Sequence, residues 1–185
     1  MSPRRRRAVV EAVLGILLLQ SCSSGGASIP FVRLSGPMPQ ISGPSLNGAI
    51  FGPTDYAGKI VVVNFWNQDC PPCREEMPLL EQDSEALARR GVIVIGVLYV
   101  GGNWPNDLSA ARTFLTAVGV SYPTIVDSSS RMAQQFGIAG IPTTVVADRF
   151  GNLRFEVLGK VPSGQLELFV NEMEQSSSPI GSEGG

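Results

Sequence analysis

Two cysteines, Cys70 and Cys73, flank a pair of prolines at the point where an apolar run of the sequence ends. The run before them, Ile60 to Trp66, is dense in Val and aromatic residues and predicts a buried strand, and the charged stretch after Cys73 predicts a helix. We therefore expect the cysteines at a strand-to-helix corner, where unpaired N–H groups and the helix dipole favour a thiolate over a thiol. A lowered thiol pKa would make Cys70 a nucleophile near neutral pH.

The two prolines limit how that thiolate can be stabilised. Pro71 and Pro72 have no N–H group, so the Cys70 sulfur must rely on the N–H groups of Cys73 and the residues after it. A disulfide across only two intervening residues would remove little chain entropy and would be a poor structural staple. The pair therefore indicates redox chemistry more than structural cross-linking.

Length and composition predict one domain with flexible ends, because 185 residues with 43% hydrophobic content can bury one core. The predicted organisation is a signal peptide over 1–21, a flexible tether over 22–35, the folded domain over 36–175 and a disordered polar tail over 176–185.

The N-terminus predicts export. Arg4 to Arg7 precede an apolar run, Ala8 to Leu19, that is broken only by Glu11, as in a secretory signal. The run is shorter than the roughly 20 residues that span a bilayer. Because Leu19-Gln20-Ser21-Cys22 resembles a bacterial lipobox, we expect Cys22 to be lipidated and the domain to lie at the outer face of the cytoplasmic membrane. Cleavage without lipid and an uncleaved signal anchor remain alternatives.

Charge and ligand content argue against two classes of function. Residues 1–21 contain four Arg and one Glu, which leaves 10 basic and 15 acidic residues and a formal net charge of −5 in the rest of the chain. This balance argues against nucleic acid as a partner. A metal site at Cys70 and Cys73 would need two more ligands, whereas the chain has no His and its third Cys lies at the tether. No metal or other cofactor is predicted.

The rest of the chain predicts strands and helices around this corner. The apolar run Val92 to Val100 is a second buried strand, parallel to the first because a helix connects them. Residues 101–107 are expected to form a loop in which Trp104 is exposed and is a candidate recognition residue or loop plug. The other expected elements are a hairpin before Lys59, helices over 73–90, 108–118, 128–136 and 165–173, and strands over 122–126, 143–147 and 153–158.

This order resembles the thioredoxin fold and, more closely, the membrane-tethered TlpA/ResA/CcmG-like thiol–disulfide oxidoreductases, over about Pro44 to Met173. The resemblance implies an α/β thioredoxin fold with a central mixed sheet flanked by helices, an N-terminal β-hairpin extension and a central strand–helix insertion. The motifs that carry it are Val63-Asn64-Phe65-Trp66, the run from Cys70 to Pro78, Tyr122-Pro123, Asp127, and Gly140-Ile141-Pro142-Thr143-Thr144.

The resemblance also implies roles for site residues. Pro142 is expected to be cis and to lie against the disulfide, with Ile141 and Thr143 beside it at the substrate-binding edge; an ordinary trans turn is the alternative. Cys70 is expected to be the exposed, attacking sulfur and Cys73 the resolving one, with a mixed disulfide as the intermediate.

Several neighbours of the cysteines depart from the family's pattern. Asn64 stands where thioredoxins often carry a buried Asp, and Asn cannot act as a base. Asp69 stands where an aromatic residue is usual, and its carboxylate should raise the Cys70 pKa if the two side chains face each other, with Arg74 opposing it.

Other candidates near the site have ordinary explanations. Trp66 is expected to pack in the core beneath the site, with contact to substrate as the less favoured alternative. Glu75 and Glu76 are interpreted as first-turn acids favoured by the helix dipole. Asp107 is only a loose substitute for a Glu that the reducing branch carries, so the acid–base group stays unassigned.

The resulting hypothesis is an exported, lipid-anchored reductant of extracytoplasmic protein disulfides. The resemblance implies a cysteine-containing protein substrate and a transmembrane thiol reductase as electron donor. A disulfide-forming oxidant and a non-catalytic binding module are alternatives. A peroxidase is disfavoured, because the sequence has no Pro-x-x-x-Thr-x-x-Cys pattern.

Overall fold

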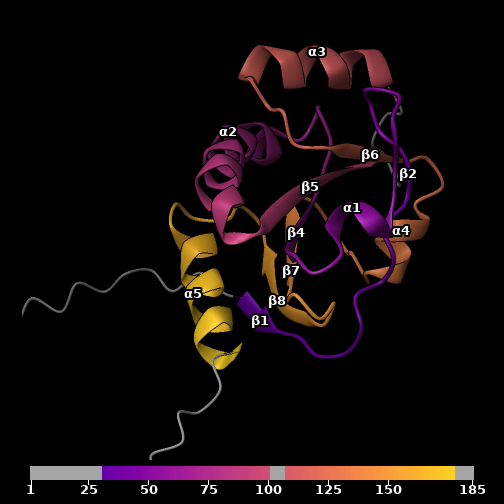
Figure 1. Cartoon of the computed structure of the whole chain (residues 1–185). Coiled ribbons are helices and arrows are strands. Elements are labelled where there is room, and N and C mark those ends of the chain that lie inside the picture. The colour runs from indigo at the N-terminus through magenta and orange to yellow at the C-terminus, as the bar shows by residue number, and fades with distance from the viewer. Residues whose placement is uncertain (1–30, 101–106, 178–185) are drawn as a thin grey trace, which may run out of the picture.

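The computed structural model describes residues 31–100 and 107–177 (Figure 1). Its main sheet has the strand order β1-β8-β7-β4-β5-β6, in which β4, β5 and β6 are parallel and the other pairs are antiparallel. The mixed sheet and the parallel central pair are as predicted. The strands are β1 (Phe31–Arg33), β4 (Ile60–Trp66), β5 (Val92–Tyr99), β6 (Thr124–Asp127), β7 (Thr143–Ala147) and β8 (Leu153–Leu158).

Helices cover both faces of this sheet, with α2 and α5 on one face and α1 and α4 on the other (Figure 1). A small antiparallel hairpin of β2 (Gly43–Pro44) and β3 (Ile50–Phe51) precedes the central strands, as the sequence predicts. The helical segments are α1 (Pro53–Tyr56), α2 (Pro71–Leu87), the 3₁₀ turn η1 (Ala88–Arg90), α3 (Leu108–Val118), α4 (Arg131–Gln135) and α5 (Gln165–Ser177).

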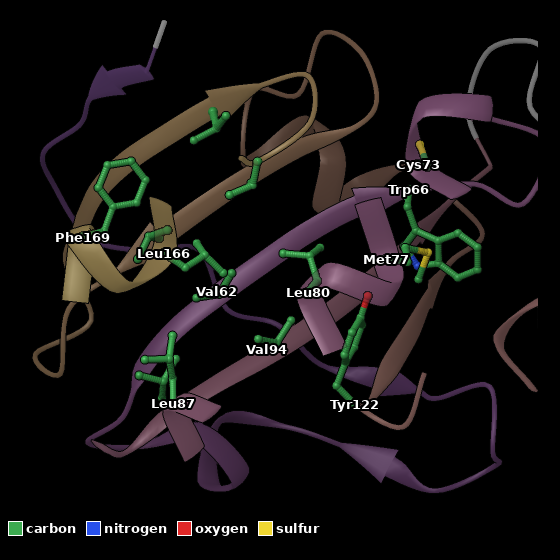
Figure 2. Packing of buried hydrophobic residues seen from close by; sticks show 14 of the residues in the cluster. Val62, Trp66, Cys73, Met77, Leu80, Leu87, Val94, Tyr122, Leu166 and Phe169 are labelled. Atoms are coloured by element: carbon green, nitrogen blue, oxygen red, sulfur yellow. The ribbon is translucent and has the colours of Figure 1, made fainter. Parts of the chain in front are cut away.

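Strand β4 is buried along its whole length because side chains on its two faces enter two separate clusters. Val62 and Trp66 belong to the same cluster as Leu80 of α2 and Phe169 of α5, and in Figure 2 Trp66 lies at the N-terminal end of α2, away from Phe169. Val61, Val63 and Phe65 face α1 and α4. This double cover fixes the end of β4, from which the chain enters the cysteine turn.

Gly96 in β5 allows the indole of Trp66 to approach the sheet closely. A Cβ atom at this position would lie 2.7 Å from Thr124 Oγ1 and 3.1 Å from Trp66 Nε1. A side chain here would therefore push Trp66 out of place, directly beneath the cysteine turn.

Some boundaries correct the sequence-based predictions. The predicted tether over 22–35 is wrong at its end, because Phe31–Arg33 forms β1 and pairs with β8. The Phe31 ring packs edge-on against Phe155 and Phe169, with centroids 5.8 and 5.1 Å away. Helix α2 begins at Pro71 instead of Cys73, because proline suits the first helical positions.

The predicted strand over 122–126 and the helix over 128–136 begin later than expected, at Thr124 and Arg131. The last helix continues to Ser177, into the predicted tail. The signal peptide, Cys22 and Trp104 lie outside the described residues. Among residues 31–100 and 107–177, no helix has both the length and the apolar run needed to cross a bilayer.

Candidate active site

The two cysteines form a disulfide at the N-terminus of α2, with a Cα–Cα distance of 5.3 Å. Cys70 is the N-cap residue, and its Sγ accepts a hydrogen bond from the backbone N–H of Cys73 at 3.3 Å. Pro71 and Pro72 occupy the positions between them and offer no donor. The predicted source of thiolate stabilisation is therefore in place, and it combines one N–H group with the positive end of the helix dipole.

The expectation that Cys70 is exposed is wrong. Cys70 is 1% exposed and Cys73 is fully buried, whereas Pro71 and Pro72 are exposed. The turn after β4 is held inward, because Asn67 Nδ2 donates to Tyr99 O at 2.8 Å and Cys70 N donates to Asn67 O at 3.1 Å. A partner sulfur therefore needs a local rearrangement of this turn to reach Cys70.

The Ile141–Pro142 peptide bond is cis, as the resemblance implies. Thr143 opens β7 and pairs with Phe65, next to the end of β4, and its hydroxyl donates to Gly140 O at 2.8 Å. Pro142 is buried and its carbonyl accepts from Gly159 N at 2.9 Å, while Ile141 is partly exposed. This segment lies at the same edge of the sheet as the cysteine turn. Its role in substrate binding stays a prediction.

A buried pair of polar side chains, Glu76 and Asn64, lies behind the disulfide. Glu76 is fully buried; its Oε1 accepts from Val161 N at 2.7 Å and its Oε2 from Asn64 Nδ2 at 3.2 Å. Asn64 Nδ2 also donates to Thr144 Oγ1 at 2.9 Å. Burial raises the pKa of Glu76 to about 7, although both hydrogen bonds and the charge of Lys160 act against the rise. A carboxyl group with this pKa can both hold and release a proton at neutral pH.

The interpretation of Glu75 and Glu76 as first-turn acids is wrong, because α2 starts at Pro71 and its first turn holds no acidic residue. Glu76 is turned toward the core. The spacing in the sequence does indicate that Glu76 is buried. Glu76 follows Cys73 by three residues and precedes Leu80 by four, so the three residues share one helix face. Glu75 points outward and forms an ion pair with Lys160 at 2.5 Å. Helical spacing, taken with the apolar positions, would have separated these two neighbours.

The other predicted neighbours surround the turn at different depths. Trp66 is fully buried, with its ring 5.7 Å from that of Phe114, which confirms its packing role. In Figure 2, Trp66, Cys73 and Met77 lie together at the N-terminal end of α2. Asp69 is exposed and accepts a hydrogen bond from Gln68 Nε2 at 3.3 Å. Its effect on the Cys70 thiol stays a prediction.

Two remaining charged candidates lie on the α3 side of the turn. Arg74 donates to Gln68 O at 3.2 Å and stacks over the ring of Phe114. Asp107 is the N-cap of α3, where its Oδ1 accepts from Ala110 N at 2.9 Å. Asp107 is thus engaged at a helix end, and Glu76 is the acid that lies behind the cysteines.

The sheet order, the Cys-x-x-Cys pair at a helix N-terminus and the cis proline before β7 define a thioredoxin-fold protein with a site for thiol–disulfide exchange. The chain belongs to the AhpC/TSA family, whose model matches residues 34–156.

Comparisons with individual proteins point to one group of relatives. Thiol-disulfide oxidoreductase ResA of Halalkalibacterium halodurans is 31% identical over 125 residues, which cover 68% of this chain and 66% of that protein. The chain thus matches about two thirds of the length of that relative.

Two solved structures extend the match. A thioredoxin-family thiol:disulfide interchange protein of Chlorobium tepidum has a TM-score of 0.64 and 27% identity, covering 77% of this chain and 97% of that one. A secreted thiol-disulfide isomerase of Corynebacterium glutamicum has a TM-score of 0.67 and 26% identity. The match covers 78% of this chain and 92% of that one. The chain is therefore a thioredoxin-fold relative of ResA-type thiol–disulfide oxidoreductases, and the predicted family and fold are confirmed.

Proposed function

We propose that this chain is an extracytoplasmic thiol–disulfide oxidoreductase that acts as a reductant of disulfides in exported proteins. The observation that carries the proposal is the Cys70–Cys73 pair at the start of α2, with a backbone N–H group on the Cys70 sulfur and a buried acid behind it. The names of the relatives, which include thiol-disulfide oxidoreductases and a secreted protein, support the same activity.

The reaction transfers two electrons in two exchange steps. The Cys70 thiolate attacks one sulfur of the substrate disulfide; the substrate S–S bond breaks, and a mixed disulfide forms as one substrate thiolate leaves. The Cys73 thiolate then attacks Cys70 Sγ, which releases the second substrate thiolate and forms the Cys70–Cys73 disulfide. The substrate ends with two thiols, and the protein is oxidised by two electrons.

Glu76 takes the proton of the resolving thiol in the second step. It lies one helical turn after Cys73 on the same face of α2, and its pKa of about 7 suits proton transfer near neutral pH. The other polar group behind the cysteines, Asn64, holds the Glu76 carboxylate through Nδ2. Asn64 thus serves as a positioning residue and Glu76 as the base, which fills the role that the sequence left unassigned.

The source of electrons and the membrane attachment complete the proposal. A transmembrane thiol reductase returns the disulfide to the dithiol after each turnover, and lipid on Cys22 tethers the domain at the outer face of the cytoplasmic membrane. The N-terminal charge and apolar pattern and the Ser/Gly-rich segment after Cys22 support this arrangement.

The reducing direction is tested by the reduction potential, and trapping tests for exchange with polypeptide substrates. We expect a potential well below that of DsbA, about −120 mV, when the protein is equilibrated with glutathione buffers. A value near DsbA's would favour the disulfide-forming alternative.

Cys73→Ser expressed in the native host should accumulate mixed disulfides on Cys70. A wild-type protein that fails to reduce insulin disulfides, while Cys70→Ser still binds partners, would support a binding module instead.

A further inference from the structure

A groove of about 490 Å³ lies along α3, and Arg74, near the start of α2, is its lining residue closest in sequence to the cysteines. Its walls are mostly apolar or small and come from the outer side of α3, while Arg74 of α2 forms its edge nearest the disulfide. Arg74 is tied to the reactive residue, since its backbone N–H donates to Cys70 O at 3.1 Å. The lining residues from α3 include Ala110, Thr113, Phe114 and Ala117.

The guanidinium of Arg74 is held in place without a counterion among the described residues. Its Cζ lies 4.5 Å from the centroid of the Phe114 ring, and one N–H group donates to Gln68 O. Within the described residues, no carboxylate forms an ion pair with Arg74, whose side chain is exposed. Stacking on an aromatic face orients the planar fork of an arginine and leaves its remaining donors for a ligand.

The second charged group of the groove does not supply that counterion. Asp107 lies at the start of α3, where its carboxylate accepts the backbone N–H of Ala110 as a helix cap. The groove therefore carries one cation, Arg74, which the Phe114 ring orients, and one carboxylate, Asp107, which is engaged at the start of α3. An occupant that pairs with Arg74 carries a carboxylate, which matches the guanidinium fork with two parallel hydrogen bonds.

We propose that this groove binds an acidic side chain, Asp or Glu, of the polypeptide substrate, close in sequence to the substrate cysteine that Cys70 attacks. The inference rests on the proposed function and specifies its substrate class: exported polypeptides with a carboxylate near the reacting cysteine. Arg74 is then a specificity residue, and Phe114 positions it.

The test compares the reduction of paired peptides by the reduced protein. Each peptide has one cysteine held as a disulfide with 2-mercaptoethanol, and carries either Glu or Gln at one of the three positions on either side of the cysteine. Reduction oxidises the Cys70/Cys73 dithiol and releases the peptide thiol and 2-mercaptoethanol. At one or more positions, we expect the rate constant for Glu to exceed that for Gln about threefold at low salt, as for an exposed ion pair.

Substitutions at Arg74 and Arg89 separate recognition of the peptide's Glu by Arg74 from a general effect of the protein's charge. Arg74→Gln should remove the preference for Glu, and Arg74→Lys, which keeps the charge but loses the planar fork, should retain only part of it. Arg89→Gln removes the same charge from the far end of the same helical segment, where Arg89 is exposed, and should leave the preference unchanged. The preference should also decline at about 0.5 M salt.

The outcomes are distinguishable. If Arg74→Gln slows Glu and Gln peptides by the same factor, Arg74 acts on the Cys70 sulfur or on packing, and the recognition role is overturned. Equal rates for wild type at all positions also overturn it, while leaving the exchange activity intact. Failure of the wild-type protein to reduce any peptide contradicts the proposed function itself, and the inference falls with it.

Discussion

Two buried glutamates lie on α2, Glu76 behind the disulfide and Glu81 farther along the helix, and they differ in how their carboxylates are held. Glu81 accepts hydrogen bonds from Ser121 N at 2.9 Å, from Tyr122 N at 3.3 Å and from the Ser121 hydroxyl. Glu76 accepts from one backbone N–H and one amide, and no hydroxyl of residues 31–100 and 107–177 donates to it.

This difference separates a structural carboxylate from the proposed base on the same helix. Glu81 joins α2 to the entry of β6, and its removal would leave two backbone donors without that partner. Glu76 is fully buried with fewer donors, so burial dominates and raises its pKa to about 7. Burial alone therefore does not indicate that the pKa of an acid is raised. The number of hydrogen-bond donors that face its carboxylate must be considered as well.

The largest effect is expected from Glu76→Gln, which removes the proposed base but keeps the size of the side chain. Resolution of the mixed disulfide should slow about 100-fold, the scale of general-base catalysis. The measurement is the decay of a preformed mixed disulfide on Cys70, followed by mass spectrometry. Glu75→Gln is the matched control, because Glu75 is exposed and ion-paired with Lys160. Equal decay rates of the mixed disulfide in the two variants would show that Glu76 is not the base.

The same residue should impose a pH dependence on stability. Glu76 has a pKa of about 7 in the folded protein and an ordinary value of 4.5, so the folded state binds its proton more tightly. Its contribution to the free energy of unfolding is fully present below pH 4.5 and is lost as the pH rises to about 7. The loss amounts to about 3 kcal/mol.

Urea unfolding at about pH 5 and about pH 8 checks this sign. The wild type should lose more stability than Glu76→Gln between these values, and above pH 7 the variant should be the more stable of the two. Parallel stability curves for the two proteins would show that the folded-state pKa of Glu76 is ordinary.

Glu81→Ala should show the opposite pattern, with a cost in stability and little effect on exchange. Loss of the carboxylate should lower the free energy of unfolding by about 2 kcal/mol, because the backbone N–H groups of Ser121 and Tyr122 lose their acceptor. Insulin reduction under native conditions should stay within about twofold of wild type. A large fall in activity with an unchanged unfolding curve would contradict the structural role of Glu81.

The smallest effect concerns Asp69, an exposed carboxylate next to Cys70. Asp69→Ala should increase the rate of iodoacetamide alkylation of reduced Cys70 at neutral pH by about twofold, since a neighbouring negative charge disfavours the thiolate. The effect should shrink with added salt, as expected for an exposed charge. An unchanged alkylation rate would mean that the Asp69 carboxylate points away from the sulfur.

The sequence predicted the parts of the fold that local pattern controls. Strands β7 and β8 have the predicted bounds, and the cysteines lie at the predicted corner with the expected N–H group on Cys70. Strand β1 was missed because three residues are too few to show alternation, and its place depends on the rings of Phe155 and Phe169, far along the chain.

At the site, the errors concern burial that distant residues decide. The inward turn at Cys70 depends on the hydrogen bond from Asn67 to Tyr99 O, which joins segments 32 residues apart. The environment of Glu76 depends on Val161, 85 residues away. Such contacts follow from the assembled sheet and helices. Helical spacing could place Glu76 on the buried face of α2, but it could not identify the partners of its carboxylate.

The buried position of Cys70 has a consequence for a reductant that works among oxidants. We expect small oxidants and alkylating reagents to react slowly with Cys70 while the turn at Asn67 stays closed, because Pro71 and Pro72 are the residues exposed between the two cysteines in the disulfide form. A dithiol buried in the same way would be protected kinetically from such reagents between encounters with its polypeptide substrates.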